Sequence, residues 1–427
     1  MKSFIAKILK FFAKRAIKKN NPIVIGITGS VGKTGAKHTV SYILDKFFFT
    51  GGSIKNYNNE IGYPLSILGI DSASKSVLAW AKILFLAFKK AYFNSDFPEV
   101  LVLELAARKP GDIDYLGEIA EFDAVIITAI GPSHIEKFGS IKQIAKEKFS
   151  IAKHLKKNGK LIYNFDDEIV REAAKTVKAD CISYGFNKGA DFQAVSGKDI
   201  NLNFDENGNF IGSGFKVERA GSFMPIRLVN VISKAQAYSV LAGLVVSDVF
   251  NINLVEAVER LKDLPAFPGR MSLISGIEET LIIDDSYNAS PASMEMALES
   301  LGEFKNRRRI AALGDMLELG SFSEKYHRQV GKAAAKTANL LFLVGGEVLF
   351  LKKEALAAGM KENRIKHFSS SAEAAKAIKD EIKKGDVVLV KGSQSMRMEK
   401  IVEAIMADSE KAEELLVRQE KEWKKSN

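Results

Sequence analysis

Runs of β-branched and aliphatic residues alternate with amphipathic helical patterns along most of the chain. The run at 23–27 predicts a buried strand, and a helical spacing of apolar residues after it extends to Leu44. Further buried strands are expected at EVLVLELA and DAVIITAI, and a helix near 235–250. Between them, the short alternating runs at 190–229 predict β-hairpins. The pattern is that of an α/β domain with a mostly parallel sheet.

Strand and helix patterns alternate a second time from residue 280 onward. The predicted strands are TLIIDD, RIAALGD, LLFLVGG, RIKHFS and VVLVKGS. They indicate a second α/β domain, and without GxGxxG after its first strand it is not predicted to bind a dinucleotide. Two prolines and a glycine at 264–270 predict a hinge. The expected divisions are a basic helix at 1–20, a central domain at 21–266, a C-terminal domain at 267–405 and a charged helical tail at 406–427.

The first twenty residues combine apolar side chains at helical spacing with many lysines. This pattern suits a helix lying on anionic lipid, and equally a helix packed on the protein's own surface. Residues 77–93 form a second apolar pattern with lysines at intervals, for which core packing is favoured over a membrane-facing surface. No run in the N-terminal helix is long enough to span a bilayer, and no signal peptide is expected. The tail at 406–427 is interpreted as a solvated helical face.

The composition of the chain indicates its partners and cellular compartment rather than its chemistry. The net charge of +10 suits anionic partners such as nucleotides or anionic lipid, and no nucleic-acid-binding motif is present. Cys181 is the one cysteine, so no intramolecular disulfide is possible and a reducing cytosol is favoured. We expect a cytoplasmic monomer, with peripheral contact to the inner face of the membrane through residues 1–20 as an option.

The first strand breaks into a glycine-containing loop that leads directly into a helix. In TGSVGKT, the backbone N–H groups of Gly29, Ser30 and Gly32 can cradle a phosphate, Lys33 can reach the β- and γ-phosphates, and the Thr34 hydroxyl can hold Mg²⁺. The strict P-loop spacing has a glycine five positions before Gly32, where this chain has isoleucine. An ordinary glycine turn is the alternative, disfavoured because Gly-Lys-Thr sits where the strand ends.

Two further polar residues follow predicted strands. Glu104 stands near the end of one buried strand, and His134 comes just after another. Because ligands gather at the carboxyl ends of parallel strands, these side chains can complete a site begun by Lys33 and Thr34. Taken singly, Glu104 could be a surface carboxylate and His134 a capping or core histidine.

Several motifs in this order resemble the Mur ligase family, the ATP-dependent amide ligases of peptidoglycan precursor synthesis. They are GITGSVGKT, NNEIGYP, LELAARKPGDI, GPSHIEKFGSIKQIAKEK, FPGR, IIDDSYNASP, LGDMLELG and VKGS. DDSYNASP with GDMLELG is similar to the members that add D-alanyl-D-alanine. The resemblance covers roughly residues 22–405 and implies a central P-loop ATPase-type domain followed by a C-terminal Rossmann-like α/β domain.

The resemblance also implies a mechanism. ATP phosphorylates a substrate carboxylate, and the incoming amine attacks the resulting acyl phosphate and releases phosphate. Lys33 would contact the phosphates, while Thr34, Glu104, His134 and Lys148 match the ligands of Mg²⁺. Lys148 matches a lysine that is carbamylated in many members, which turns a cation into an anion able to bind metal. The neighbouring lysine at 146 leaves that register open.

The second half supplies the remaining implied residues. Arg270 matches an arginine that reaches the phosphates when the domains close, and Asp285 and Asn288 match positions near the ribose and phosphates. Motif residues around the amine substrate, without assigned roles, are Asp315, Glu318, His327, Lys391 and Ser393.

Three departures from the family pattern are visible. The usual N-terminal domain, which holds the UDP-sugar, is replaced by the basic helix; the usual Gly-x-His-Asn reads Ser-Lys-Ala-Gln at 233–236; and Ala106 replaces a glycine. The leading hypothesis is addition of D-alanyl-D-alanine to a muramyl tripeptide. The alternatives are the same chemistry on a lipid-linked or polyglutamate-type acceptor, or a non-catalytic nucleotide-binding membrane scaffold, which the set of phosphate and metal groups disfavours.

Overall fold

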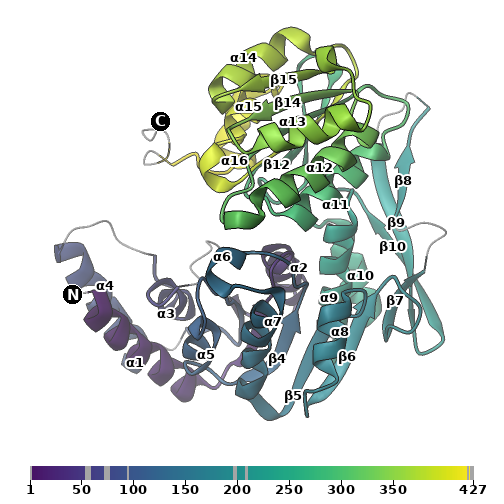
Figure 1. The fold of residues 1–427 in the computed structure, drawn as a ribbon. Coiled ribbons are helices and arrows are strands. Elements are labelled where there is room, and N and C mark those ends of the chain that lie inside the picture. The colour runs from purple at the N-terminus through teal and green to yellow at the C-terminus, as the bar shows by residue number, and fades with distance from the viewer. Residues whose placement is uncertain are drawn as a thin grey trace.

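Two α/β domains, each built around one sheet, follow one another along the chain (Figure 1). The structure is a computed structural model, and it describes residues 2–52, 59–71, 77–93, 96–195, 200–206, 210–420 and 423. The first sheet ends at β10 (Ser222–Leu228) and the second begins at β11 (Ser272–Ser275), so the predicted hinge at 264–270 lies between them.

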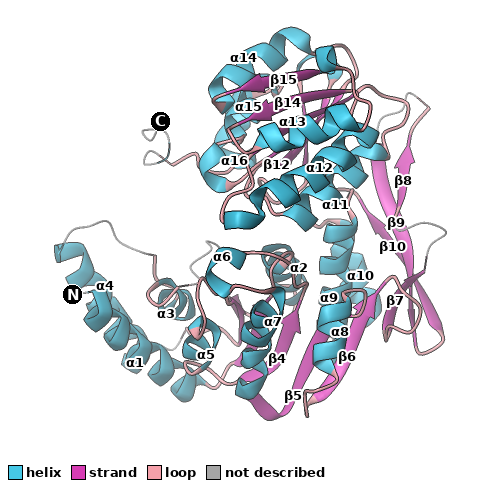
Figure 2. Ribbon diagram, viewed as in Figure 1, coloured by secondary structure: helices cyan, strands magenta, loops and turns pink. Residues whose placement is uncertain are grey.

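The sheet of the first domain has ten strands among the described residues, in the order β10-β9-β7-β6-β5-β4-β1-β3-β2, with β8 beside β9 (Figure 2). The remaining strands are β1 (Ile23–Thr28), β2 (Thr50–Gly51), β3 (Val100–Glu104), β4 (Phe122–Ile127), β5 (Leu155–Asn164), β6 (Asp180–Gly185), β7 (Phe192–Val195), β8 (Asn201–Phe204) and β9 (Phe210–Arg219). All pairings from β2 to β7 are parallel, and β7 to β10 pair antiparallel. The strands predicted at the start of the chain and the hairpins of 190–229 are confirmed; residues 196–199 and 207–209 lie outside the described part.

Helices cover both faces of this sheet, which is why its central strands are almost continuously apolar. The helices are α1 (Lys2–Asn20), α2 (Lys33–Leu44), α3 (Gly62–Leu68), α4 (Val77–Phe93), α5 (Asp112–Gly117), α6 (Ile135–Phe138), α7 (Ile141–Phe149), α8 (Glu168–Ala174), α9 (Lys234–Val249) and α10 (Leu254–Lys262). Helices α2, α9 and α10 share one core with the sheet, and α1, α3 and α4 share the core on its other face. The glycine loop between β1 and α2 therefore lies at the carboxyl edge of a rigid sheet.

The second domain is a six-stranded sheet in the order β11-β12-β16-β13-β14-β15. Its strands after β11 are β12 (Leu281–Asp285), β13 (Arg309–Gly314), β14 (Leu340–Val344), β15 (Ile365–Phe368) and β16 (Val387–Lys391). Its helices are α11 (Pro291–Gly302), α12 (Ser323–Thr337), α13 (Val348–Ala357), α14 (Ser371–Glu381), α15 (Glu399–Ile405) and α16 (Ala412–Leu415). The five predicted strands are confirmed and pair in parallel, and β11 adds an antiparallel edge.

The basic N-terminal helix packs along α4 at the edge of the first domain (Figure 1). One side of α1 is buried, with Leu9 and Ala13 fully inaccessible, so the prediction of packing on the protein's own surface holds for that side. Lys10 also reaches Glu118, with 2.7 Å between Nζ and Oε2. Phe4 and Phe11 stay exposed on the other side. None of the helices in the described ranges combines the length and apolar character needed to cross a bilayer.

The prediction of a solvated helical tail is wrong for the described part of 406–420. Helix is confined to a 3₁₀ turn at Ser409–Lys411 and to α16. Leu416 and Arg418 are buried, and the Arg418 guanidinium pairs with the buried Glu399 carboxylate at 2.7 Å. A charged sequence misled the prediction because a buried ion pair between distant residues leaves no periodic signal.

Candidate active site

The glycine loop is held in shape by contacts with the end of β4. Gly32 has φ of 88°, a conformation that costs glycine little, and a Cβ on Gly29 would lie 2.1 Å from the Thr128 hydroxyl. The Ser30 N–H donates to the Ala129 carbonyl at 2.6 Å. These contacts fix both glycines and leave the α2 N-terminus facing the space above the sheet, as a phosphate cradle requires.

The missing P-loop glycine has a structural explanation. Ile27, which stands at that position, lies within β1 and is fully buried. Gly26 is also inside the strand, where a Cβ would come within 2.7 Å of the Phe122 ring. Neither residue belongs to the loop, so the turn is built by Gly29 and Gly32.

Lys33 and Thr34 open α2 and join a compact polar cluster. The Lys33 ammonium donates to the Gly29 carbonyl at 2.8 Å, folding the side chain over its own loop. The Thr34 hydroxyl donates to Glu104 Oε2 at 3.0 Å and accepts from the Arg270 guanidinium at 3.1 Å. The structure thus brings Lys33, Thr34, Glu104 and Arg270 together, although Arg270 comes from the hinge more than two hundred residues later in the chain.

Cations outnumber carboxylates within this cluster. Burial alone would raise the pKa of Glu104, but Lys33, Lys37 and Arg270, together with the Thr34 hydrogen bond, hold that pKa below its ordinary value. Burial lowers the pKa of Lys33, and Glu104 partly opposes this effect. The carboxylate is therefore ionised, and the positive charge around it favours a polyanion such as a nucleoside triphosphate.

The two neighbouring lysines of α7 have opposite environments. Lys146 is exposed, whereas Lys148 is only 4% exposed. Burial, assisted by repulsion from Lys33, lowers the pKa of Lys148 to about 7. The carboxylate of Glu147, between them, accepts the backbone N–H groups of Gly111 and Ile113 at 2.8 Å each. It is therefore engaged with the loop before α5 and the start of that helix. Geometry therefore favours Lys148 over Lys146 as the residue directed at the cluster.

His134 contacts the second domain. It begins α6 in a left-handed backbone conformation, with φ of 53°. Its Nδ1 is 2.8 Å from Glu318 Oε2, and this histidine lowers the pKa of Glu318. Both residues line the cavity described below. Among the described residues, no group of three or more His, Cys, Asp or Glu side chains is arranged to hold a metal ion.

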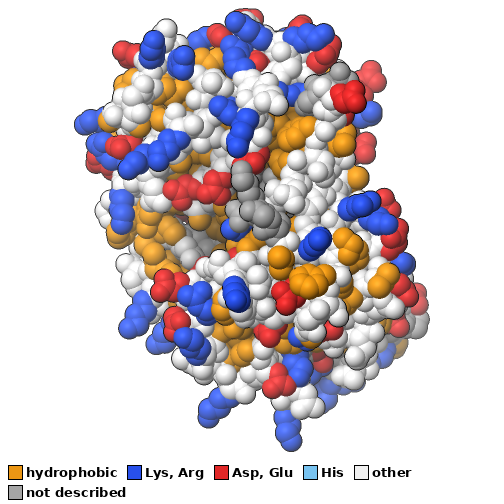
Figure 3. Space-filling model, turned by 90° about the vertical axis from the view of Figure 1, so that its right-hand side faces the viewer, with side chains coloured by type: hydrophobic (Ala, Val, Ile, Leu, Met, Phe, Trp, Pro, Cys, Tyr) orange, Lys and Arg blue, Asp and Glu red, His pale blue; other side chains and the backbone are white. Residues whose placement is uncertain are grey.

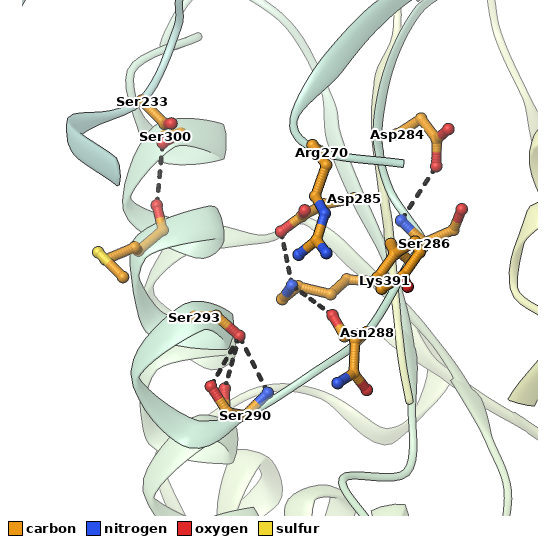
Figure 4. Close-up of polar contacts among 12 residues, drawn as sticks. Ser233, Arg270, Asp284, Asp285, Ser286, Asn288, Ser290, Ser293, Ser300 and Lys391 are labelled. Atoms are coloured by element: carbon orange, nitrogen blue, oxygen red, sulfur yellow. Dashed lines mark hydrogen bonds and ion pairs between the residues drawn. The ribbon is translucent and has the colours of Figure 1, made fainter. Parts of the chain in front are cut away.

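The loop after β12 and the end of β16 contribute polar residues of the second domain to the cavity lining, which we call the second wall; the glycine loop and the cluster around Glu104 are the first wall. Figure 4 shows how the residues of the second wall pair with one another. The Lys391 ammonium donates to Asp285 Oδ2 at 2.6 Å and to the Asn288 carbonyl at 2.8 Å. Burial opposes both charges of this pair, raising the pKa of Asp285 and lowering that of Lys391. The adjacent Asp284 instead accepts the Gly269 N–H at 3.1 Å and so ties the hinge to β12.

Two of the motif residues around the amine substrate, for which no role was predicted, have partners within the protein. The Asp315 carboxylate accepts the Gly346 and Val348 N–H groups at 3.0 and 2.9 Å, at the start of α13. The His327 ring is fully buried, and its Nε2 accepts the Met316 N–H at 3.0 Å. Neither side chain lines the cavity, whereas Glu318, Lys391 and Ser393 do.

A cavity of about 720 Å³ lies between the two domains and collects these groups. Its lining includes Lys33, Thr34, Glu104, His134, Arg270, Asp285, Asn288, Lys391 and Ser393. Lys148 does not line it, and is linked to the cluster through the charges of Lys33 and Glu104, which act on its pKa. The lining also includes Trp423. No sequence pattern indicated this, because a tryptophan of a charged tail that lines a cavity has the same local sequence as one exposed to solvent.

The 233–236 departure is a helix cap. Ser233 and Gln236 form a reciprocal capping box at the start of α9. Gln236 Nε2 also donates to the Arg270 carbonyl at 3.4 Å, so the cap touches the hinge. Nearby, Phe267 lines the cavity and stacks on His38 with ring centroids 4.5 Å apart. Phe267 therefore gives this part of the cavity an apolar side chain near the capped start of α9.

Fold and site together define an enzyme of two α/β domains, in which a glycine loop of the phosphate-binding type borders the cavity between them. Two family models match the chain: the Mur ligase middle domain over residues 86–245, and the Mur ligase glutamate ligase domain over 269–394. The chain belongs to the Mur ligase family. The family resemblance and the fold class predicted from the sequence are thereby confirmed.

Comparison with individual proteins shows which members of the family the chain is similar to. The chain is 29% identical over 400 residues to the UDP-N-acetylmuramoyl-tripeptide–D-alanyl-D-alanine ligase of Bacillus subtilis, covering 93% of this chain and 79% of the relative. It is 28% identical to the enzyme of the same description from Escherichia coli, covering 90% and 76%. The crystal structure of MurF ligase from Thermotoga maritima in complex with ADP superposes with a TM-score of 0.76 at 25% identity, covering 93% of this chain and 83% of that one.

Proposed function

We propose that this protein is an ATP-dependent, ADP-forming amide ligase that joins D-alanyl-D-alanine to the carboxylate of a muramyl tripeptide. The observation that carries the proposal is the cavity between the domains, where a phosphate loop with Lys33 and Thr34 faces the Asp285–Lys391 pair. In the first step the tripeptide carboxylate attacks the γ-phosphorus of ATP, and ADP leaves. In the second, the amine attacks the acyl carbon and phosphate leaves, so one amide forms for each ATP cleaved.

The reacting groups are anionic, so positioning and neutralisation carry the catalysis. Lys33, freed from the Gly29 carbonyl, is placed to meet the phosphates. Arg270 reaches the same cluster from the segment between the domains, and its guanidinium carbon lies 4.0 Å from the centre of the Tyr287 ring. This position supports the proposal that closure of the domains would complete the site. Asp285 and Asn288 lie on the wall that would contact the ribose and the incoming amine.

Mg²⁺ fits the oxygen donors of the first wall. Proteins commonly hold this ion with one or two carboxylates plus substrate phosphates. The ionised Glu104 carboxylate and the Thr34 hydroxyl, 3.0 Å apart, provide such a set, and His134 lies on the same cavity. Bound there, the ion would neutralise charge on the phosphates. Arg270 and Lys37 would then turn toward substrate oxygens, because the carboxylate they face would be shared with metal.

Carbamylation of Lys148 fits its buried position. Carbon dioxide adds only to a neutral amine, and a pKa of about 7 keeps much of Lys148 neutral at physiological pH, unlike an ordinary lysine near roughly 10.4. Adding carbon dioxide and releasing a proton converts the amine to an anion. That anion would offset the positive charge of Lys33, whose repulsion contributes to the lowered pKa of Lys148.

The direct test is ADP release by the full-length protein with Mg²⁺-ATP, UDP-muramyl-tripeptide and D-alanyl-D-alanine, with mass spectrometry of the product. We expect a joined pentapeptide and ADP release that needs both co-substrates. ADP release without either would indicate a simple ATPase. Turnover only with a lipid-linked or polyglutamate-type acceptor would support the ligase reaction but show that the acceptor is a different molecule. We expect a monomer to be active, which sedimentation under assay conditions would test.

A further inference from the structure

The outer side of α1 alternates aromatic and basic side chains. Phe4, Lys7, Phe11, Lys14 and Lys18 are all exposed and recur every three or four residues, which places them on one stripe of the helix. Phe4 is 68% and Phe11 57% exposed, although the other side of the same helix is buried in the core. Helix formation and core packing therefore do not account for these two rings.

Helix α4 repeats the same arrangement. Leu78, Lys82, Phe85, Lys89 and Phe93 are exposed and again follow one stripe. The three apolar members are 83%, 64% and 71% exposed, in chain order. The sequence pattern favoured core packing for this segment, and the structure shows that only the side with Ile83 and Ala87 is packed.

Aromatic contacts join the two stripes into one surface. Ring centroids are 5.7 Å apart for Phe11 and Phe12, 6.0 Å for Phe12 and Phe88, and 5.8 Å for Phe88 and Phe93. This series crosses from α1 to α4, which lie side by side at the edge of the first domain (Figure 1). We call the two stripes with Phe12 and Phe88 the α1–α4 face.

The charge of the α1–α4 face has one sign. Neither helix contains an acidic residue in its sequence. Lys10, at the inner border, is already paired with Glu118 and is not counted in the face. On the opposite side of the molecule, by contrast, basic and acidic side chains are intermingled (Figure 3). The face is therefore both apolar and cationic.

We propose that the α1–α4 face docks on the surface of an anionic lipid bilayer, with both helices lying in the plane of the interface. The exposed rings would enter the boundary between headgroups and acyl chains, while the lysines between them meet lipid phosphates. A protein partner fits less well, because lysine is depleted from the cores of protein interfaces whereas here it separates the rings at nearly every turn. Docking is independent of the ligase reaction.

Flotation of the full-length protein with lipid vesicles tests the proposal. We expect binding to vesicles of phosphatidylcholine mixed with phosphatidylglycerol, little binding to phosphatidylcholine alone, and release at high salt. Phe4→Ser with Phe85→Ser should reduce partitioning by about tenfold or more. The matched control replaces Ile211 and Val255, exposed apolar residues outside the face, by serine and should bind normally.

Charge reversals separate this face from general attraction by a basic protein. Lys7, Lys18 and Lys82 changed together to glutamate should reduce partitioning by at least about fivefold for each lysine. The control reverses Lys332, Lys353 and Lys376, exposed lysines of the second domain, and so has the same net charge. Circular dichroism and ATP turnover should be unchanged in all four variants, because none alters the cavity.

Two outcomes would overturn the proposal. One is equal loss of binding in the face and control reversals, which would reduce the effect to net charge. The other is wild-type protein that ignores anionic vesicles but sediments as a dimer that Phe4→Ser with Phe85→Ser dissociates, which would make a second copy the occupant of the face.

Discussion

The two walls of the cavity balance their charges differently. On the first wall, Lys33, Lys37 and Arg270 surround the Glu104 carboxylate. On the second, Lys391 is paired with Asp285 at 2.6 Å, and the charges of Arg270 and Asp284 also act on this pair, so cations and carboxylates balance. Several cations held close together repel one another, which costs free energy unless an anion binds among them. An ion pair needs no further charge. The charge of the first wall thus suits phosphate, as the proposed function requires, whereas the pair on the second wall holds its own loop in place.

Removing Lys33 should have the largest effect, because it takes away a cation that faces the transferred phosphoryl group. We expect Lys33→Ala to lower kcat by about 10³-fold, near the upper end of losses for one electrostatic contact. Substrate-dependent ADP release measures this. Lys46→Ala, an exposed lysine just after the same helix, should retain full activity. Near-normal rates in Lys33→Ala would mean that the excess of cations on the first wall is not used to bind phosphate.

Lys148→Ala should come next, with loss of about 10²-fold or more if a carbamate there supports the metal, in line with the effect of removing an outer ligand. Short carboxylic acids such as acetate should restore part of the activity, because they can supply the missing anion. Lys146→Ala is the matched control and should be active without added acid. Acid rescue of Lys146→Ala instead would shift the register by two residues.

Breaking the pair on the second wall should reduce stability. Lys391→Met leaves Asp285 buried without its cation, and we expect the free energy of unfolding to fall by about 3 kcal/mol. Chemical denaturation measures the loss. Replacing both partners, Lys391→Met with Asp285→Leu, should recover much of the stability but no activity. If the double variant also recovers activity, the pair serves only the fold and the second wall has no chemical role.

The free energy of unfolding should also depend on pH through Lys148. Its folded pKa of about 7 lies below the ordinary lysine value near roughly 10.4, so between these values the unfolded chain binds a proton that the folded chain does not. Stability from this residue therefore rises with pH across that window, by up to about 1.4 kcal/mol per unit. Denaturation in buffer free of Mg²⁺ and bicarbonate should show a steeper rise for wild type than for Lys148→Met. Parallel curves would contradict the burial of an unmodified amine.

The sequence predicted the parts of this site that depend on local pattern. The strand before Gly29, the end of β3 at Glu104 and the connection between the two domains at 264–270 all follow from runs of apolar residues and turn residues. Contacts between distant segments were beyond such patterns. The Arg270–Thr34 hydrogen bond and the Arg418–Glu399 ion pair each join residues that only the folded chain brings together. The same holds for Asp315, whose carboxylate caps α13 instead of facing a substrate.

Trp423 offers the mildest and most specific test of the second wall. Its ring lies near the Arg397 and Arg418 guanidinium groups, at 5.5 and 5.8 Å from the ring centre, and it lines the cavity. Trp423→Ala should raise KM for D-alanyl-D-alanine by about fivefold while kcat changes little, because an aromatic contact is worth about 1 kcal/mol. Trp423→Phe should stay near wild type. In a Trp80→Phe background Trp423 is the one remaining tryptophan, so its fluorescence should respond to the amine. A response to ATP alone would indicate that Trp423 contacts the nucleotide. The roles proposed for the two walls would then have to be reassigned.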